Sequence, residues 1–152
     1  MSEQARLQEL EDIQAITRLK ARYVHAADGG WTDKPPHDAE GVASLFVPDG
    51  VWDGGRFGRG EGHDGIRAYF QGAIETTPMV FHHTSSPDIQ VDGDTATGSW
   101  HVVVPMIQAG VSSVLVGIYH DEFVRTDEGW KFKRLRFQPA NMIDLPSDWK
   151  PF

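Results

Sequence analysis

The sequence contains no cysteine, and this absence excludes several kinds of chemistry. Disulfide bonds, a thiolate nucleophile and a cysteine-based zinc site are all unavailable. The seven histidines form neither an H-E-x-x-H motif nor an H-x-H pair with a third ligand at suitable spacing, so no metal site is predicted. The glycine-rich segment 54–60 lacks the preceding apolar strand and the Gly-Lys-Ser/Thr sequence of a phosphate loop. No cofactor is expected.

Positive charge and long apolar runs are also scarce. Lysine and arginine number 14 against 22 aspartates and glutamates, and they form no cluster that could follow a phosphate backbone. We therefore expect neither nucleic acid nor membrane as a partner. No apolar run approaches the roughly 20 residues that span a bilayer. The polar N-terminus, residues 1–6, has no signal segment, which predicts a cytoplasmic protein.

Aromatic residues, in contrast, are abundant. The five tryptophans and eight phenylalanines indicate a core or cavity with aromatic walls. A chain of 152 residues can bury a substantial core and has the usual size of one domain. We assign residues 1–152 to a single domain.

The stretch from Leu10 to Asp28 is predicted to be a helix that lines a site. Its apolar residues recur at helical spacing, at Ile13, Ile16, Leu19, Tyr23 and Ala27. Tyr23 lies within this apolar stripe, and Asp28 lies at its edge just before Gly29-Gly30 ends the helix. A phenol and a carboxylate thus point toward the surface that the helix covers, which favours a functional site there.

The remaining pattern predicts an α+β fold with a curved sheet wrapped by helices. Asp38 is expected to cap a short helix that carries Val42, Leu45 and Phe46 and ends at Pro48. A third helix is predicted from Asp64 onward. A short strand is expected at 51–53, and four antiparallel strands at 88–91, 95–106, 112–125 and 130–137. The tail 145–152 is interpreted as a surface arm.

Alternation along the predicted strands indicates which faces are buried. In 95–106, one face carries Ala96, Gly98, Trp100, Val102 and Val104, which suits a concave face that a helix covers. In 130–137, Trp130 and Phe132 share one parity and Leu135 and Phe137 the other. A β-bulge near Lys133 or Arg134 would reconcile them and bend the sheet.

Several segments, taken in order, resemble the SnoaL-like group of the nuclear transport factor 2-like superfamily. They are Glu-Asp-Ile-Gln-Ala-Ile-Thr-Arg-Leu-Lys-Ala-Arg-Tyr23 with Asp28, Leu-Phe-Val-Pro-Asp-Gly-Val-Trp52, Gly62-His-Asp-Gly-Ile66, and the segments 82–100 and 119–130. The resemblance implies a cone-shaped barrel with a deep apolar pocket between the first helix and the sheet. Among the enzymes of this group, the chain is most similar to bile acid 7α-dehydratase and more distantly similar to scytalone dehydratase and hexachlorocyclohexane dehydrochlorinase.

The resemblance also implies a catalytic aspartate–histidine pair with a nearby tyrosine. These roles match Asp28, His82 and Tyr23. The chain departs from the pattern at two positions. Val104 stands where the bile acid enzyme has an aspartate, and Trp100 stands where scytalone dehydratase has a second histidine.

The residues themselves support this chemistry and also allow a plainer reading. A histidine held by a carboxylate is a competent base, because the carboxylate fixes its tautomer and stabilises the imidazolium. Tyr23 is a candidate hydrogen-bond donor to an oxyanion or leaving hydroxyl. Alternatively, Asp28 only ends the helix, His82 caps a strand and Tyr23 is a core residue. His25, His83 and His101 are expected to be structural or to point elsewhere, and His37 and His63 to lie in loops.

Six residues are candidates for substrate contact in the implied pocket. They are Trp52, Trp100, Val104, Leu115, Tyr119 and Phe137. Such walls favour a flat, hydrophobic, aromatic or alicyclic small molecule. The first hypothesis is a cofactor-independent lyase that eliminates water or halide, or that releases a small aldehyde by retro-aldol cleavage. An isomerase or cyclase would use the same residues, and a non-catalytic binding or assembly module is the third possibility. The open face of the sheet predicts a homo-oligomer, either a dimer or a trimer.

Overall fold

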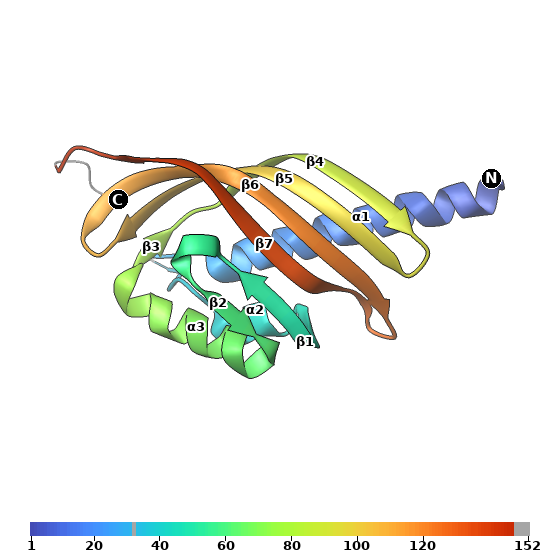
Figure 1. Cartoon of the computed structure of the whole chain (residues 1–152), viewed down its shortest axis with the longest axis horizontal. Coiled ribbons are helices and arrows are strands. Elements are labelled where there is room, and N and C mark those ends of the chain that lie inside the picture. Colours follow the sequence, from blue (N-terminus) through green and yellow to red (C-terminus); the bar gives the residue numbers. More distant parts are fainter. Residues whose placement is uncertain (32, 148–152) are drawn as a thin grey trace.

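A curved, seven-stranded mixed sheet and a long helix that crosses it dominate the computed structural model, which describes residues 1–31 and 33–147 (Figure 1). The helices are α1 (Glu3–Ala27), α2 (Ala39–Ala43) and α3 (Gly62–Thr76), with a 3₁₀ turn, η1, at Gly55–Phe57. The strands are β1 (Phe46–Asp53), β2 (Arg59–Glu61), β3 (Met79–Val80), β4 (His83–Asp92), β5 (Thr95–Gln108), β6 (Val111–Thr126) and β7 (Gly129–Asp144). The α+β prediction is confirmed, and the sheet forms a cone-shaped half-barrel.

Helix α1 is longer than the sequence pattern indicated. It begins at Glu3 because the side chain of Ser2 accepts a hydrogen bond from the Ala5 N–H, at 3.1 Å, and so caps the first turn. Leu7 and Leu10 are exposed in these early turns, which extend toward the labelled N-terminus beyond the sheet (Figure 1). The predicted start at Leu10 was wrong because an apolar stripe marks only the part of a helix that packs against something.

The second helix is shorter than predicted. Asp38 caps it as expected, since its carboxylate accepts the Gly41 N–H at 2.9 Å, but the helix ends at Ala43. Phe46 begins β1 instead. Pro48 lies inside that strand, where the pairing with β7 shifts register between Phe46 and Val51, and such an irregularity tolerates a residue without an N–H.

The sheet has the order β2-β1-β7-β6-β5-β3, and β4 pairs with β5. Only the β1–β7 pair is parallel among the paired strands in the described residues. Glu122 pairs with Arg134 and Phe123 with Phe132, so Lys133 is an extra residue in β7. This is the predicted bulge, and it brings Phe132, Leu135 and Phe137 to the same buried side despite their mixed parity.

Strand boundaries differ from the sequence prediction at several places. β4 begins at His83 rather than Asp88, and β7 continues to Asp144 rather than ending at Phe137. The backbone N–H of Leu145 still bonds Ser112, at 2.8 Å, so the predicted arm is tied to the sheet at its first residue. Residues 148–152 of that arm lie outside the described part of the chain.

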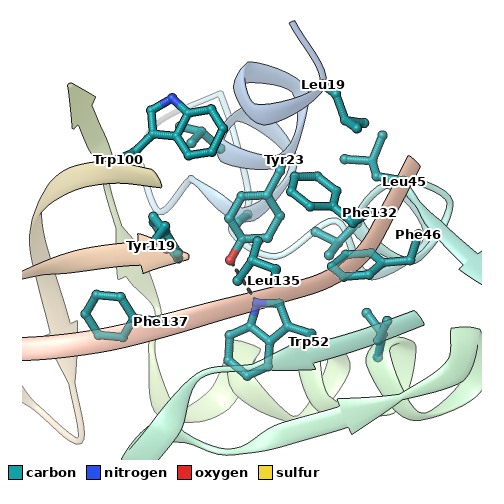
Figure 2. Packing of buried hydrophobic residues seen from close by; sticks show 14 of the residues in the cluster. Leu19, Tyr23, Leu45, Phe46, Trp52, Trp100, Tyr119, Phe132, Leu135 and Phe137 are labelled. Carbon is teal, nitrogen blue, oxygen red and sulfur yellow. Dashed lines mark hydrogen bonds between the residues drawn. The ribbon is translucent and has the colours of Figure 1, made fainter. Parts of the chain in front are cut away.

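The buried faces match the expected alternation. In β5 the residues Ala96, Gly98, Trp100, Val102 and Val104 are buried, whereas His101 and Val103 are exposed. The buried face of β5, β6 and β7 meets Ile16, Leu19 and Tyr23 of α1 to form the core (Figure 2). None of the helices in residues 1–31 and 33–147 is long and apolar enough to cross a bilayer.

Candidate active site

Two backbone segments meet at the C-terminal end of α1 and position the candidate catalytic residues. The Gly29 N–H donates to the Val80 carbonyl and the Val80 N–H donates to the Gly29 carbonyl, both at 3.0 Å. Gly30 has φ +101°, and a Cβ there would lie 2.2 Å from the Pro78 carbonyl oxygen, so the close approach requires glycine. This bridge brings Asp28, just before it on one segment, next to His82, just after it on the other.

Asp28 and His82 form a hydrogen-bonded pair. His82 Nδ1 lies 2.6 Å from Asp28 Oδ1, and the His82 backbone N–H donates to the same oxygen at 2.9 Å. The two side chains are only 7% and 12% exposed. A carboxylate can only accept from Nδ1, so Nδ1 carries the hydrogen and Nε2 is left with a free lone pair. The arrangement is that of a histidine base oriented by a carboxylate.

Tyr23 reaches the same region from α1, one turn before Asp28. Its hydroxyl oxygen accepts a hydrogen bond from Trp52 Nε1 at 2.9 Å, and Figure 2 shows these two groups pointing toward each other. The partners of the Tyr23 oxygen are thus the indole of Trp52 and the hydroxyl of Tyr119 rather than the backbone. Burial raises the pKa of Tyr23, which keeps the phenol protonated at neutral pH. With Trp52 as donor, the Tyr23 O–H remains able to donate to a third group.

The side chains around this pair line an apolar cavity that is open to solvent at its mouth. Of the predicted site residues, the lining contains His82, Tyr23, Trp52, Val104, Leu115, Tyr119 and Phe137. Asp28 stands behind His82. Trp100 lies outside the lining and instead packs against Phe123, with ring centroids 6.0 Å apart, and against the ammonium of Lys20.

His37 lines the same cavity, although the sequence indicated only a loop residue. Its Nε2 lies 2.9 Å from the Thr77 carbonyl, so Nε2 is the donor, and its backbone has φ +59°. Burial lowers the pKa of His37, which keeps the ring neutral. No sequence signal could have found this residue, because an irregular loop has no periodicity from which to infer a buried face.

Lys20 and Asp121 form a second feature that the sequence reading missed. Lys20 Nζ lies 2.7 Å from Asp121 Oδ2, and both side chains are buried. Burial lowers the pKa of Lys20 to about 8 and raises the pKa of Asp121. Here a signal existed: Lys20 lies between Ile16 and Tyr23 in the helical stripe, and Asp121 shares the inward parity of Tyr119 and Phe123.

The remaining histidines, all in the described part of the chain, do not form hydrogen bonds with the dyad. His83 and His101 are exposed, and His63 bonds the Phe46 carbonyl at 2.8 Å. His25 does not pair with Asp28, and its own carbonyl accepts a hydrogen bond from Lys34. Within residues 1–31 and 33–147, no three histidine, aspartate or glutamate side chains gather as a metal site would require.

The fold and cavity define a class of protein, a cone-shaped α+β domain with an apolar pocket between its first helix and its sheet. The chain belongs to the SnoaL-like domain family, whose model matches residues 8–136. An uncharacterised protein of Mycobacterium tuberculosis is 30% identical over 133 residues, which cover 83% of this chain and 84% of the relative.

Solved structures agree with this assignment. A protein from Novosphingobium aromaticivorans, provisionally named an aromatic ring hydroxylase, has a TM-score of 0.78 and 27% identity, covering 90% of this chain and 94% of its own. A hexachlorocyclohexane dehydrochlorinase also has a TM-score of 0.78, with 99% and 98% of the two chains covered. Its identity is 19%, so it supports the fold alone.

Proposed function

We propose that this protein is a cofactor-independent lyase of small aromatic or alicyclic molecules, in which His82 is the base, Asp28 orients it and Tyr23 binds oxygen. The observation that carries the proposal is the 2.6 Å contact between His82 Nδ1 and Asp28 Oδ1 at the wall of an apolar cavity. A base that is pre-oriented at a mainly apolar wall needs no cofactor to remove a proton next to a carbonyl.

The elimination proceeds in two balanced steps. His82 Nε2 takes a proton from the carbon next to a ketone, and the electron pair of that C–H bond moves to the carbonyl oxygen as an enolate. The enolate then re-forms the carbonyl and a carbon–carbon double bond, while the C–O bond at the next carbon breaks. The proton on His82 passes to the departing oxygen, so water leaves and the base is regenerated.

The lining supports a hydrophobic cyclic substrate. Its walls are mainly aromatic and aliphatic, and few polar groups are available to orient a ligand. The aromatic ring hydroxylase name of the N. aromaticivorans relative is in keeping with a ring-shaped ligand. A hydroxylase would need an oxidant, and the dyad supplies proton transfer only.

The test uses cyclic ketones and β-hydroxy ketones as probes. Wild-type protein is expected to exchange the α-proton of a ketone such as 2-tetralone in D₂O, followed by NMR, and to release one water from a cyclic β-hydroxy ketone, followed by mass spectrometry. His82→Gln and Asp28→Asn should lower these rates about 100- to 10,000-fold, the usual contribution of a general base.

His83→Gln is the matched control, because it removes an adjacent but exposed histidine. It should leave both rates unchanged. Full activity in a folded His82→Gln variant would disprove the assignment. A product with the same mass as its substrate, formed in H₂O without loss of water, would instead move the protein to the isomerases, which use the same residues.

A further inference from the structure

A buried ion pair stands directly behind the two phenols of the cavity wall. Lys20 comes from α1 and Asp121 from β6, and their side chains are 2% and 0% exposed. Tyr23 and Tyr119 both line the cavity, and Lys20 lies behind both rings. Neither charged residue has a part in the proton transfer proposed above.

Stability alone gives no reason for this pair. Removing two charges from water costs several kcal/mol per ion, and apolar residues of similar volume often replace a buried pair at no loss. The three N–H groups of Lys20 have one bonded oxygen among the described residues, that of Asp121. The ammonium otherwise faces aromatic rings, whose cation–π attraction offsets only part of the cost of burying the two charges.

The ammonium is placed against the phenols rather than away from them. Lys20 Nζ is 3.4 Å from the ring centroid of Tyr119 and 5.1 Å from that of Tyr23. Trp100 from β5 and Phe132 from β7 complete its surroundings, at 5.2 and 5.8 Å, and carry no charge. Asp121 is therefore the one ionised group that faces Lys20 from the described elements packed around it.

The cation at this position favours a negative charge that forms near the phenol oxygens, whereas the Asp121 carboxylate disfavours one and raises the pKa of both phenols. Electrostatic interactions are stronger in a buried site than in water, because little solvent screens them. Trp52 and the Tyr119 hydroxyl both donate to the Tyr23 oxygen, which leaves the Tyr23 O–H free to donate into the cavity. The Tyr119 ring lies 6.1 Å from that of Tyr23 and 6.4 Å from that of His82, so the two phenols and the base surround one region.

We propose that Lys20 is a positioning residue that makes the Tyr23 and Tyr119 hydroxyls a binding site for a negatively charged oxygen on a cyclic ligand. This inference rests on the proposed function and narrows its substrate class to ring compounds whose oxygen becomes an enolate or phenolate. Lys20 acts through the phenols and does not touch the ligand. Asp121 keeps the lysine protonated at neutral pH, since its carboxylate opposes the effect of burial.

The probe for this site is 4-nitrophenol, whose ionised form absorbs visible light, with 4-nitroanisole as its uncharged counterpart. Binding of both is measured by titration from pH 5 to 9 in a His82→Gln background, which removes any contribution of the imidazolium. The ratio of the affinity for the phenolate to the affinity for 4-nitroanisole is expected to be about tenfold higher with Lys20 than in Lys20→Met. The affinity for 4-nitroanisole itself should change little. This preference should fade as the pH rises through about 8, where Lys20 loses its proton.

The Asp121→Asn variant is a second, independent test of the role of Lys20. It should shift the loss of phenolate preference to lower pH, because the ammonium loses the carboxylate that stabilises it. A purely structural role for the pair predicts instead that Lys20→Met weakens both probes equally and that neither variant changes the pH profile. That result, or no saturable binding of 4-nitrophenol, would overturn the inference.

The two proposals fail separately. Probe binding is an equilibrium measurement that requires no turnover, so a Lys20-dependent phenolate preference without ketone exchange would retain the anion site and reject the lyase. Ketone exchange that requires His82, in a protein without a Lys20-dependent phenolate preference, would retain the lyase and reject the anion site.

Discussion

Tyr23 combines a packing role with a proposed chemical one at the scale of a single residue. Tyr23→Phe removes only the hydroxyl, and the buried Trp52 indole N–H then loses its acceptor. An unsatisfied buried donor costs about 1–3 kcal/mol. We expect the free energy of unfolding to fall by this amount in urea denaturation.

The matched control removes the donor as well. Trp52→Phe in the Tyr23→Phe background eliminates the orphaned N–H, so the double variant should lose less stability than the two single variants added together. The interaction free energy from this double-mutant cycle measures the bond. Simple additivity would mean that the Tyr23–Trp52 hydrogen bond contributes nothing to folding.

The residues of the dyad were predictable from sequence, whereas its geometry was not. Helical spacing put Tyr23 and Asp28 at the end of one face, and the family resemblance suggested His82 as the partner. The contact itself depends on the Gly29–Val80 bridge, a pairing between segments about 50 residues apart that no local pattern encodes. The sequence did not identify His37 as a cavity residue for the same reason, because only tertiary contacts bury its loop.

At the scale of elements, α1 is fixed to the β6–β7 hairpin by Asp12. Its carboxylate accepts two hydrogen bonds from Arg125, at 2.7 and 2.8 Å, and one from Trp130 Nε1, at 3.0 Å. The hydrogen bond from Arg125 is the largest cause that lowers the pKa of Asp12, to about 2. The folded state therefore binds the Asp12 proton less tightly than the unfolded state.

This difference predicts a pH dependence of stability with a definite sign. The stabilisation of the folded state by the Asp12 carboxylate is fully present above the unfolded-state pKa of about 4. It is lost as the pH falls through the folded-state pKa of about 2. Wild type should lose about 2 kcal/mol more than Asp12→Asn between pH 5 and pH 2. Urea denaturation across this range measures the difference, and parallel curves for the two proteins would contradict it.

The second connection of α1 to the sheet, Lys20 with Asp121, should behave differently when both partners are replaced. Lys20→Met or Asp121→Leu alone leaves one buried charge without a partner, which costs about 3–5 kcal/mol. The double variant should regain wild-type stability to within about 1 kcal/mol, because two apolar side chains of similar volume then meet in the core. A double variant as unstable as either single variant would contradict this prediction and show that the ion pair itself stabilises the fold.

The sequence predicted elements best where one face of each is buried. Alternation in β5 and the mixed parity of β7 predicted the concave face and the bulge at Lys133, since both follow from burial alone. The sequence predicted only the end of β1, at 51–53, and it did not predict β3. Met79–Val80 is too short to show a period, and β1 contains Pro48-Asp49-Gly50, a segment that predicted the end of a helix instead.

At the scale of the whole molecule, the outer face of the sheet predicts self-association. Val103 is 39% exposed and pairs with the partly exposed Val116, next to Ile118 on the same face. Apolar side chains gathered in this way favour burial against another surface. We expect light scattering to give two or three times the mass of one chain.

Val116→Lys should shift this equilibrium toward the monomer, because it places a charge in the centre of the apolar face. Arg18→Lys, a conservative change on the outer side of α1, is the control and should leave the mass unchanged. A wild-type monomer at micromolar concentration would contradict the prediction of an oligomer.

The Gly29–Val80 bridge has a consequence for how such a protein diversifies. Main-chain hydrogen bonds join the two segments that carry Asp28 and the proposed base His82, whereas the cavity is shaped by the side chains of Val104, Leu115 and Phe137, which stand on separate strands. Substitutions at these three positions can change the size and shape of the ligand without moving the base. The scaffold can thus acquire new specificities by ordinary point mutation while the Asp28–His82 pair is inherited intact.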